Sequence, residues 1–199
     1  MKKGIIAIII LIVLGVIIGG WYIRTNNMLV DMKGQATKQW ANVESSYQRR
    51  SDLIGNLVKT VQGAADFEER VLTEVTEARA KATSTNLDPS NITQDRLNEF
   101  QQAQTGLSSS LARLLATIER YPDLKGSQNF LELQSQLEGT ENRINVERNR
   151  FNDLAGEYNI KIKQIPTNII ASLANFDEMA LFASNPGAEN APDANFDFE

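Results

Sequence analysis

The sequence predicts an all-α protein with a single N-terminal transmembrane helix, an elongated antiparallel helical bundle of about four helices, and a disordered acidic tail. Three observations predict it. An uncharged apolar stretch lies near the N-terminus, apolar residues then recur at steps of three and four, and the C-terminus is rich in Asn, Pro, Ala and Asp. We therefore divide the chain into a membrane anchor (1–24), a helical-bundle domain (25–176) and an acidic low-complexity tail (177–199).

The anchor is the stretch from Gly4 to Ile23, which contains no charged residue. Its 20 residues would form a helix about 30 Å long, which matches the hydrocarbon thickness of a bilayer. Basic and aromatic residues typical of the membrane interface flank it, namely Lys2, Lys3, Trp21, Tyr22 and Arg24. The sequence thus predicts the lipid bilayer as a partner.

A cleaved secretory signal is the alternative interpretation of this stretch. Such a signal has an apolar region of only about 7–15 residues and small residues at its cleavage site. Here the apolar stretch is longer, and the bulky Ile17 and Ile18 precede the Gly19-Gly20 pair. A retained anchor is therefore favoured, and a lipoprotein is excluded because the chain has no cysteine to acylate.

The orientation in the membrane rests on the basic residues beside the anchor. Lys2 and Lys3 lie directly against a short N-terminal end, which favours that end on the cytoplasmic side. Arg24, Lys33 and Lys38 on the other side bring the balance close to even. We expect the bundle to be extracytoplasmic.

Four segments with apolar residues at helical spacing, here called stripes, follow the anchor. The first runs from Ala36 to Ala65 and contains Gly55 and Gly63, which favour a bend or a close approach of another helix. The second covers 67–82, and the pattern leaves open whether it continues the first. A loop is expected at 83–93, because this segment is rich in turn-forming residues.

The last two long stripes have clear ends. One covers 97–121 and stops at Pro122. The other begins after Ser127, a good N-cap residue, and continues to Ile165 before Pro166. A helix about 55–60 Å long is too long for a small globule, so the body should be elongated. A short apolar segment at 169–173 precedes the tail.

Composition excludes several function classes. The absence of both Cys and His removes disulfides, Cys/His metal sites, and Cys- or His-dependent catalysis. The net charge of −5 argues against nucleic-acid binding. We expect no enzyme activity and no cofactor. Residues 183–199 contribute four of the negative charges and contain no basic residue. A docking role for Phe196 and Phe198 is the minor alternative to a solvated tail.

Charged residues interrupt two of the apolar stripes. Arg49, Arg50 and Asp52 lie between Tyr47 and Ile54, and Glu141 and Arg148 fall on the apolar face of the last helix. In an antiparallel bundle these groups could meet in one polar layer that sets the helix register. A carboxylate–arginine catalytic or metal site is the less favoured interpretation, because the acidic residues are too scattered. The Gly15–Gly19 spacing in the anchor is a weak signal for self-association.

Several strings in the sequence resemble the LemA family of bacterial membrane proteins. They occur in the family's order between residues 25 and 176, and they are RRSDLIGNLV (49–58), VTEAR (75–79), ERYPDLK (119–125), LEGTENRI (137–144), RFN (150–152), EYN (157–159) and PTN (166–168). Gly55 stands where the family usually has proline, which leaves the bend in the first helix open.

The resemblance implies an N-terminal anchor and an extended helical bundle in the bacterial inner (cytoplasmic) membrane, with no established enzymatic activity. Related proteins are associated with remodelling or organising membranes, including magnetosome membranes. Family genes often lie near membrane proteases or TPM-domain proteins. A scaffold or adaptor that binds itself or such a partner is the leading hypothesis, and an envelope ligand-binding or sensor module is the alternative. The motif residues expected to matter are Arg50, Asp52, Asn56, Glu141, Asn142 and Arg143.

Overall fold

The fold was analysed on a computed structural model that describes residues 2–63, 67–85, 87–89 and 91–183. The side chains of Lys2 and Lys3, the expected tail at 184–199 and its Phe196 and Phe198 lie outside the described residues. Helix is the only regular structure in those ranges, which confirms the all-α prediction. The helices are α1 (Lys2–Gln62), α2 (Glu69–Ser84), α3 (Gln94–Ile118), α4 (Pro122–Lys125), α5 (Gln128–Lys163) and α6 (Thr167–Leu173).

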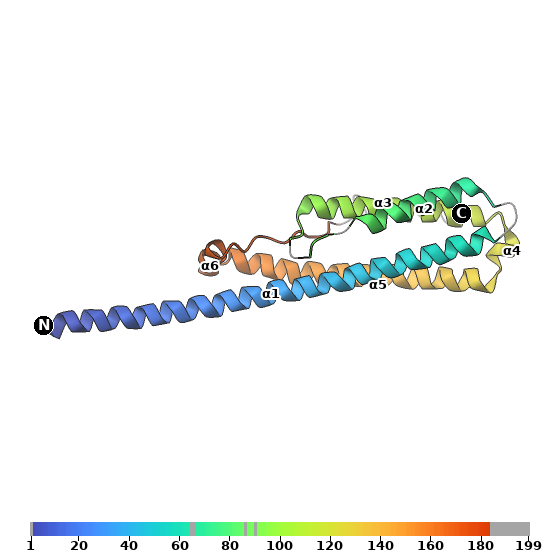
Figure 1. Cartoon of the computed structure of the whole chain (residues 1–199). Coiled ribbons are helices and arrows are strands. Elements are labelled where there is room, and N and C mark those ends of the chain that lie inside the picture. The colour runs from blue at the N-terminus through green and yellow to red at the C-terminus, as the bar shows by residue number, and fades with distance from the viewer. Residues whose placement is uncertain (1, 64–66, 86, 90, 184–199) are drawn as a thin grey trace, which may run out of the picture.

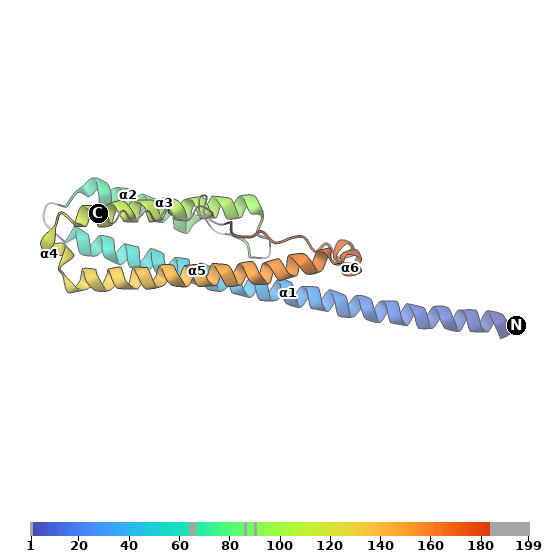
Figure 2. The ribbon, with the colours of Figure 1, turned by 180° about the vertical axis from the view of Figure 1, so that it is seen from behind.

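The helices form an elongated bundle of two layers (Figure 1). α1 packs along the antiparallel α5, and α2 packs along α3. The short α4 connects α3 to α5 at one end, and α6 lies at the other end, where the first part of α1 projects alone (Figure 2). The bundle is elongated because its longest helices pack along one another, as the stripe lengths predicted.

The anchor and the first bundle helix are one continuous helix of 61 residues. Every described side chain from Gly4 to Gly20 is exposed, as expected for a segment whose partner is lipid. Trp21 is partly covered, Tyr22 and Arg24 are exposed, and Thr25 is the first buried residue. Packing against the rest of the bundle therefore begins where the apolar stretch ends.

Gly55 lies inside α1 without interrupting it. A methyl group added there would lie 3.2 Å from Cζ of Arg79 on α2. Arg79 Nε donates a 2.7 Å hydrogen bond to the carbonyl of Ser51. Of the two expectations for this glycine, the structure shows the close approach, because the arginine side chain lies across the helix where a larger residue would crowd it.

The helix boundaries follow the local signals in the sequence. α2 is a separate helix that reverses direction after α1, which settles the point that the pattern left open. Ser127 accepts a 3.4 Å hydrogen bond from the Phe130 N–H and caps α5 as expected. α3 ends at Ile118, before Tyr121, and Pro122 instead begins α4, a position where its missing N–H costs nothing.

Buried apolar side chains form two clusters along the bundle. The cluster nearer the anchor is built around Trp40, which contacts the rings of Phe100, Phe151 and Phe182 at centroid distances of 5.4–5.7 Å. The cluster at the far end is built on aliphatic side chains of α1, α2, α3 and α5, and its fully buried members include Ile54, Leu57, Val61, Val75 and Leu114.

After α6 the chain runs back along the bundle as an extended segment, 176–183. Met179, Ala180 and Phe182 are buried in the cluster around Trp40. The tail predicted from the sequence began at residue 177, because the C-terminal residues are rich in Asn, Pro, Ala and Asp, and it therefore included nearly all of this segment. In the structure the segment is part of the packed core.

Candidate functional site

Arg50 is the centre of a polar cluster that connects four helices. Its Nη1 donates to Glu141 Oε2 on α5 at 3.1 Å and to Ser108 Oγ on α3 at 3.2 Å. Its Nη2 donates to the side-chain and main-chain oxygens of Gln104. Gln104 Nε2 in turn donates to the carbonyl of Ala82 on α2. Arg50 is only 4% exposed, so these bonds compensate the cost of burying its charge.

This cluster lies at the boundary between the two apolar clusters. On α1 it separates Tyr47 from Leu53, and on α3 Gln104 separates Phe100 from Leu107. On α5, Glu141 lies between Leu137 and Ile144 in the same way. A buried charge needs its partners, so sliding one helix past another would leave Arg50 unpaired. The cluster is therefore suited to fixing the register of α1, α3 and α5.

An open hollow of about 740 Å³ lies over the cluster, between α1, α3 and α5. Its lining includes Tyr47, Arg50, Glu141, Arg148 and Ala183. Burial raises the pKa of Tyr47, and the nearby Arg148 and Arg50 oppose this rise. Amide side chains supply much of the remaining lining: Asn98, Gln101, Gln102 and Gln104. Such a surface can both donate and accept hydrogen bonds.

Arg148 lies near Tyr47 and also contacts the extended segment. Its guanidinium lies 4.5 Å from the centre of the Phe182 ring, and Nη2 donates to the carbonyl of Ala183 at 3.4 Å. Glu141 is half exposed, with 51% of its side chain open to solvent. Arg50 and Glu141 are thus in direct contact, and Arg148 lines the same hollow while it packs on Phe182 of the extended segment.

The other predicted residues lie apart from this cluster. Asp52 points toward α2, where one of its oxygens lies 3.6 Å from Arg79 Nη2. Arg49 and Asn56 are exposed on α1. Asn142 and Arg143 are exposed on α5. These positions form no common site with Arg50, because successive residues of a helix point in different directions.

Glu147 is a buried acidic residue that the sequence analysis did not single out. Its side chain is 8% exposed, and its Oε2 accepts a 2.7 Å hydrogen bond from Gln39 Nε2 on α1. The same Gln39 nitrogen donates to the Glu147 carbonyl at 3.2 Å. Arg143 and Arg150 lie 3.8 and 3.5 Å from the carboxylate. The sequence signal for the burial of Glu147 was its position three residues after the apolar Ile144, on the same side of the helix.

Two asparagines of α5 hold the extended segment by its main chain. Asn159 donates to the Met179 carbonyl and accepts from the Met179 N–H, both at 2.8 Å. Asn152 makes the same pair of bonds to Phe182, both at 2.9 Å. Seven residues separate the two asparagines, which places both on one side of the helix. We call this arrangement the asparagine clamp, and the sequence signal for it was that spacing.

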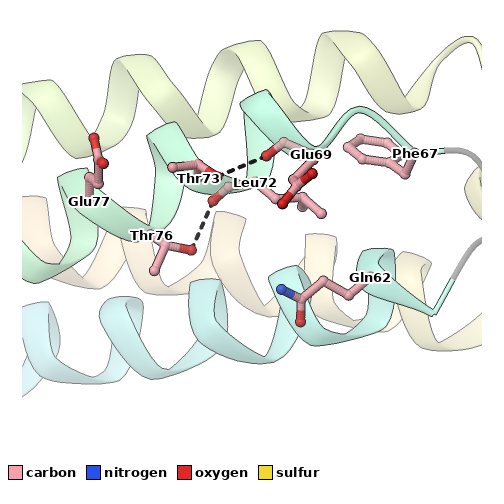
Figure 3. Close-up of a pocket in the computed structure, with 7 residues that line it drawn as sticks. All are labelled: Gln62, Phe67, Glu69, Leu72, Thr73, Thr76 and Glu77. Carbon is pink, nitrogen blue, oxygen red and sulfur yellow. Dashed lines mark hydrogen bonds between the residues drawn. The ribbon is translucent and has the colours of Figure 1, made fainter.

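A second hollow, of about 450 Å³, lies between the far end of α1 and the start of α2 (Figure 3). The hydroxyls of Thr73 and Thr76 donate to carbonyls of their own helix, at 3.0 and 2.8 Å. The carboxylates of Glu69 and Glu77 add only negative charge. Among its described lining residues nothing converges on a common point, so this hollow offers no ligand geometry.

The described parts of the chain contain no group of three or more acidic side chains that could hold a metal ion. The carboxylates of the candidate site are instead used in ion pairs with arginine. What the arrangement provides is register, rigidity and an amide-lined surface.

Comparison with known proteins gives the family. The model of the LemA family matches residues 39–196. Magnetosome protein MamQ of Magnetospirillum gryphiswaldense is 25% identical over 180 residues, which covers 82% of this chain and 66% of MamQ. Magnetosome protein MamQ 1 of Paramagnetospirillum magneticum has the same identity and coverage. Protein LemA of Metamycoplasma hominis is 23% identical over 164 residues, or 82% of this chain and 71% of that protein. The chain belongs to the LemA family.

Proposed function

We propose that this protein is a non-enzymatic scaffold or adaptor, anchored once in the bacterial cytoplasmic membrane with its bundle on the extracytoplasmic side. It acts by association of helix faces with a second copy or with a partner, for which a membrane protease or a TPM-domain protein is a candidate. The relatives named as magnetosome and LemA proteins support a membrane-associated role.

The observation that carries the proposal is the continuity of α1. One helix runs from the apolar stretch into the bundle, where Thr25 and Leu29 are already buried. With no joint between anchor and bundle, each face of the bundle keeps a fixed orientation toward its neighbours in the membrane. Fixed orientation is what a scaffold needs, because it removes part of the entropic cost of association.

The test interrupts this continuity. A flexible Gly-Ser segment is inserted between Asn26 and Asn27, and the full chain is extracted from its own membranes with an affinity tag. The control carries a seven-residue Ala-rich helical insert at the same place, which restores the helix phase to within about 20°. The mass and composition of the native particle are then measured by light scattering and mass spectrometry.

We expect the unmodified chain and the helical control to keep the same assembly, and the flexible variant to lose it. If the unmodified chain is monomeric and no other protein co-purifies with it, the proposed scaffold function is refuted. An assembly that survives the flexible insert would show that the continuity of α1 has no part in it.

The hollow over Arg50 supports one alternative, an envelope ligand-binding or sensor module. Nε of Arg50 is buried and makes no hydrogen bond within the described structure, and the surrounding amides suit a peptide or a sugar. Under this alternative, short peptides or oligosaccharides raise the melting temperature of the intact chain, and Gln101→Ala reduces that shift. Equal melting temperatures with and without these compounds would remove the alternative.

A further inference from the structure

Exposed apolar side chains gather at one end of the bundle. In the described part of the chain beyond residue 24, seven large apolar side chains are exposed, and four of these lie between residues 160 and 173. They are Ile160 (60% exposed), Ile165 (85%), Ile169 (54%) and Leu173 (69%). Single exposed apolar residues are ordinary on a protein surface, whereas a group at one place marks a contact surface.

This end of the bundle is the one from which the membrane-spanning part of α1 projects (Figures 1 and 2). The contact between Gln39 and Glu147 fixes the level of α5 against α1. Lys163, the last residue of α5, lies 16 positions beyond Glu147, and Ile23 lies 16 positions before Gln39. Because both helices rise by the same length per residue, α5 ends at the level of Ile23, where the apolar stretch also ends.

The turn after α5 and the helix α6 therefore lie at the level of Trp21 and Tyr22. α6 is held there by its own buried face, formed by Thr167, Ile170 and Ala171, and it packs against both α1 and α5. Trp21 is the first partly covered side chain of α1. In a membrane-anchored chain this level is the boundary between headgroups and acyl chains.

We propose that the exposed apolar side chains Ile165, Ile169 and Leu173 insert into the interface of the same bilayer that α1 crosses. α6 then acts as a second, shallow membrane contact beside the anchor. The inference rests on the proposed anchoring of α1. Insertion removes these side chains from water, which they contact in the bundle alone.

Charge does not determine this contact. The ammonium of Lys163 is paired with Glu178 at 2.7 Å, and that of Lys161 donates to Gln164. Asp177 precedes Glu178 in the chain, so two acidic residues accompany the two lysines in this region. The surface fits an apolar boundary rather than a particular anionic headgroup.

The absence of native cysteine allows single-site labelling of the full chain. Ile165→Cys and Ile169→Cys are labelled with an environment-sensitive fluorophore and reconstituted at low protein-to-lipid ratio in phosphatidylcholine vesicles. Lipids with a nitroxide quencher near the headgroup report contact with the interface. Ile12→Cys reports the anchor, and Val146→Cys is the matched control, since Val146 is an exposed apolar residue midway along α5.

We expect the labels at 165 and 169 to be quenched by the shallow lipid quencher, with the same result when phosphatidylglycerol is added. The label at 146 should stay in water, and the label at 12 should be reached only by deep quenchers. Water exposure at 165 and 169 with a buried label at 12 would overturn the inference and leave the anchor intact. A label at 12 in water would overturn the anchor itself. Labels at 165 and 169 that are shielded from water yet unquenched by lipid would show that another protein chain covers the surface, which also overturns the inference.

Discussion

Replacing Asn159 by alanine tests whether the asparagine clamp holds the extended segment. The change removes two hydrogen bonds of 2.8 Å and leaves the N–H and carbonyl of Met179 without their partners. Met179 is 7% exposed, so water cannot replace these bonds in the closed state. Each such bond contributes about 1–1.5 kcal/mol net, which gives a loss of about 2–3 kcal/mol for the pair.

The loss should be local, because the segment can open while the long helices remain packed. Hydrogen exchange of peptides covering 176–183 measures it, on the full chain in nanodiscs. A loss of 2–3 kcal/mol corresponds to about 30–150-fold faster exchange. Asn142→Ala is the matched control, the same substitution at an exposed position of α5. Unchanged exchange of Met179 in Asn159→Ala would refute the clamp, and equal acceleration in the control would refute its locality.

Three further predictions concern stability of the intact chain. Arg50→Ala should lower the free energy of unfolding by more than about 2 kcal/mol. Glu141→Gln should lower it by less than about 1 kcal/mol, because Glu141 is half exposed. Urea titration of both variants checks that Arg50→Ala is the more destabilising change. Burial raises the pKa of Tyr158 to about 12 from an ordinary 10, so the folded state holds its proton more tightly than the unfolded state. The stabilising contribution of the protonated Tyr158 is complete below pH 10 and falls by at most about 1.4 kcal/mol per pH unit above pH 10. Tyr158→Phe should therefore lose less stability than the unmodified chain in urea titrations at pH 8–11. Identical pH profiles of the two chains would contradict this role of Tyr158. Gly55→Ala should change the free energy of unfolding by no more than about 1 kcal/mol, because the better helix propensity of alanine offsets the displacement of Arg79. A loss of several kcal/mol in the same titration would show that the Arg79 side chain cannot move.

The helical architecture could be predicted from the sequence because its signals are local. The three-and-four spacing of apolar residues marked each long helix, and Ser127 and the prolines marked its ends. Glycine gave an ambiguous signal, since Gly55 is consistent with either a bend or a close contact. Only the position of Arg79 in space decides between them.

The polar contacts were harder to predict because they depend on which residues meet across the bundle. Arg50 contacts Glu141 in the structure, whereas the more deeply buried carboxylate is that of Glu147. The packing of 176–183 was not predicted, because the segment was grouped with the polar residues that follow it and its bonds to Asn159 and Asn152 form across the bundle. Its buried side chains are Met179, Ala180 and Phe182.

The uninterrupted α1 also makes the molecule a spacer of defined height. Thirty-nine residues separate Ile23, at the end of the apolar stretch, from Gln62, at the end of the helix. At about 1.5 Å per residue the connection between α1 and α2 stands up to about 60 Å from the membrane surface. A partner that binds near that tip would be held at that distance from the bilayer, and each heptad added to or removed from both α1 and α5 would change the distance by about 10 Å.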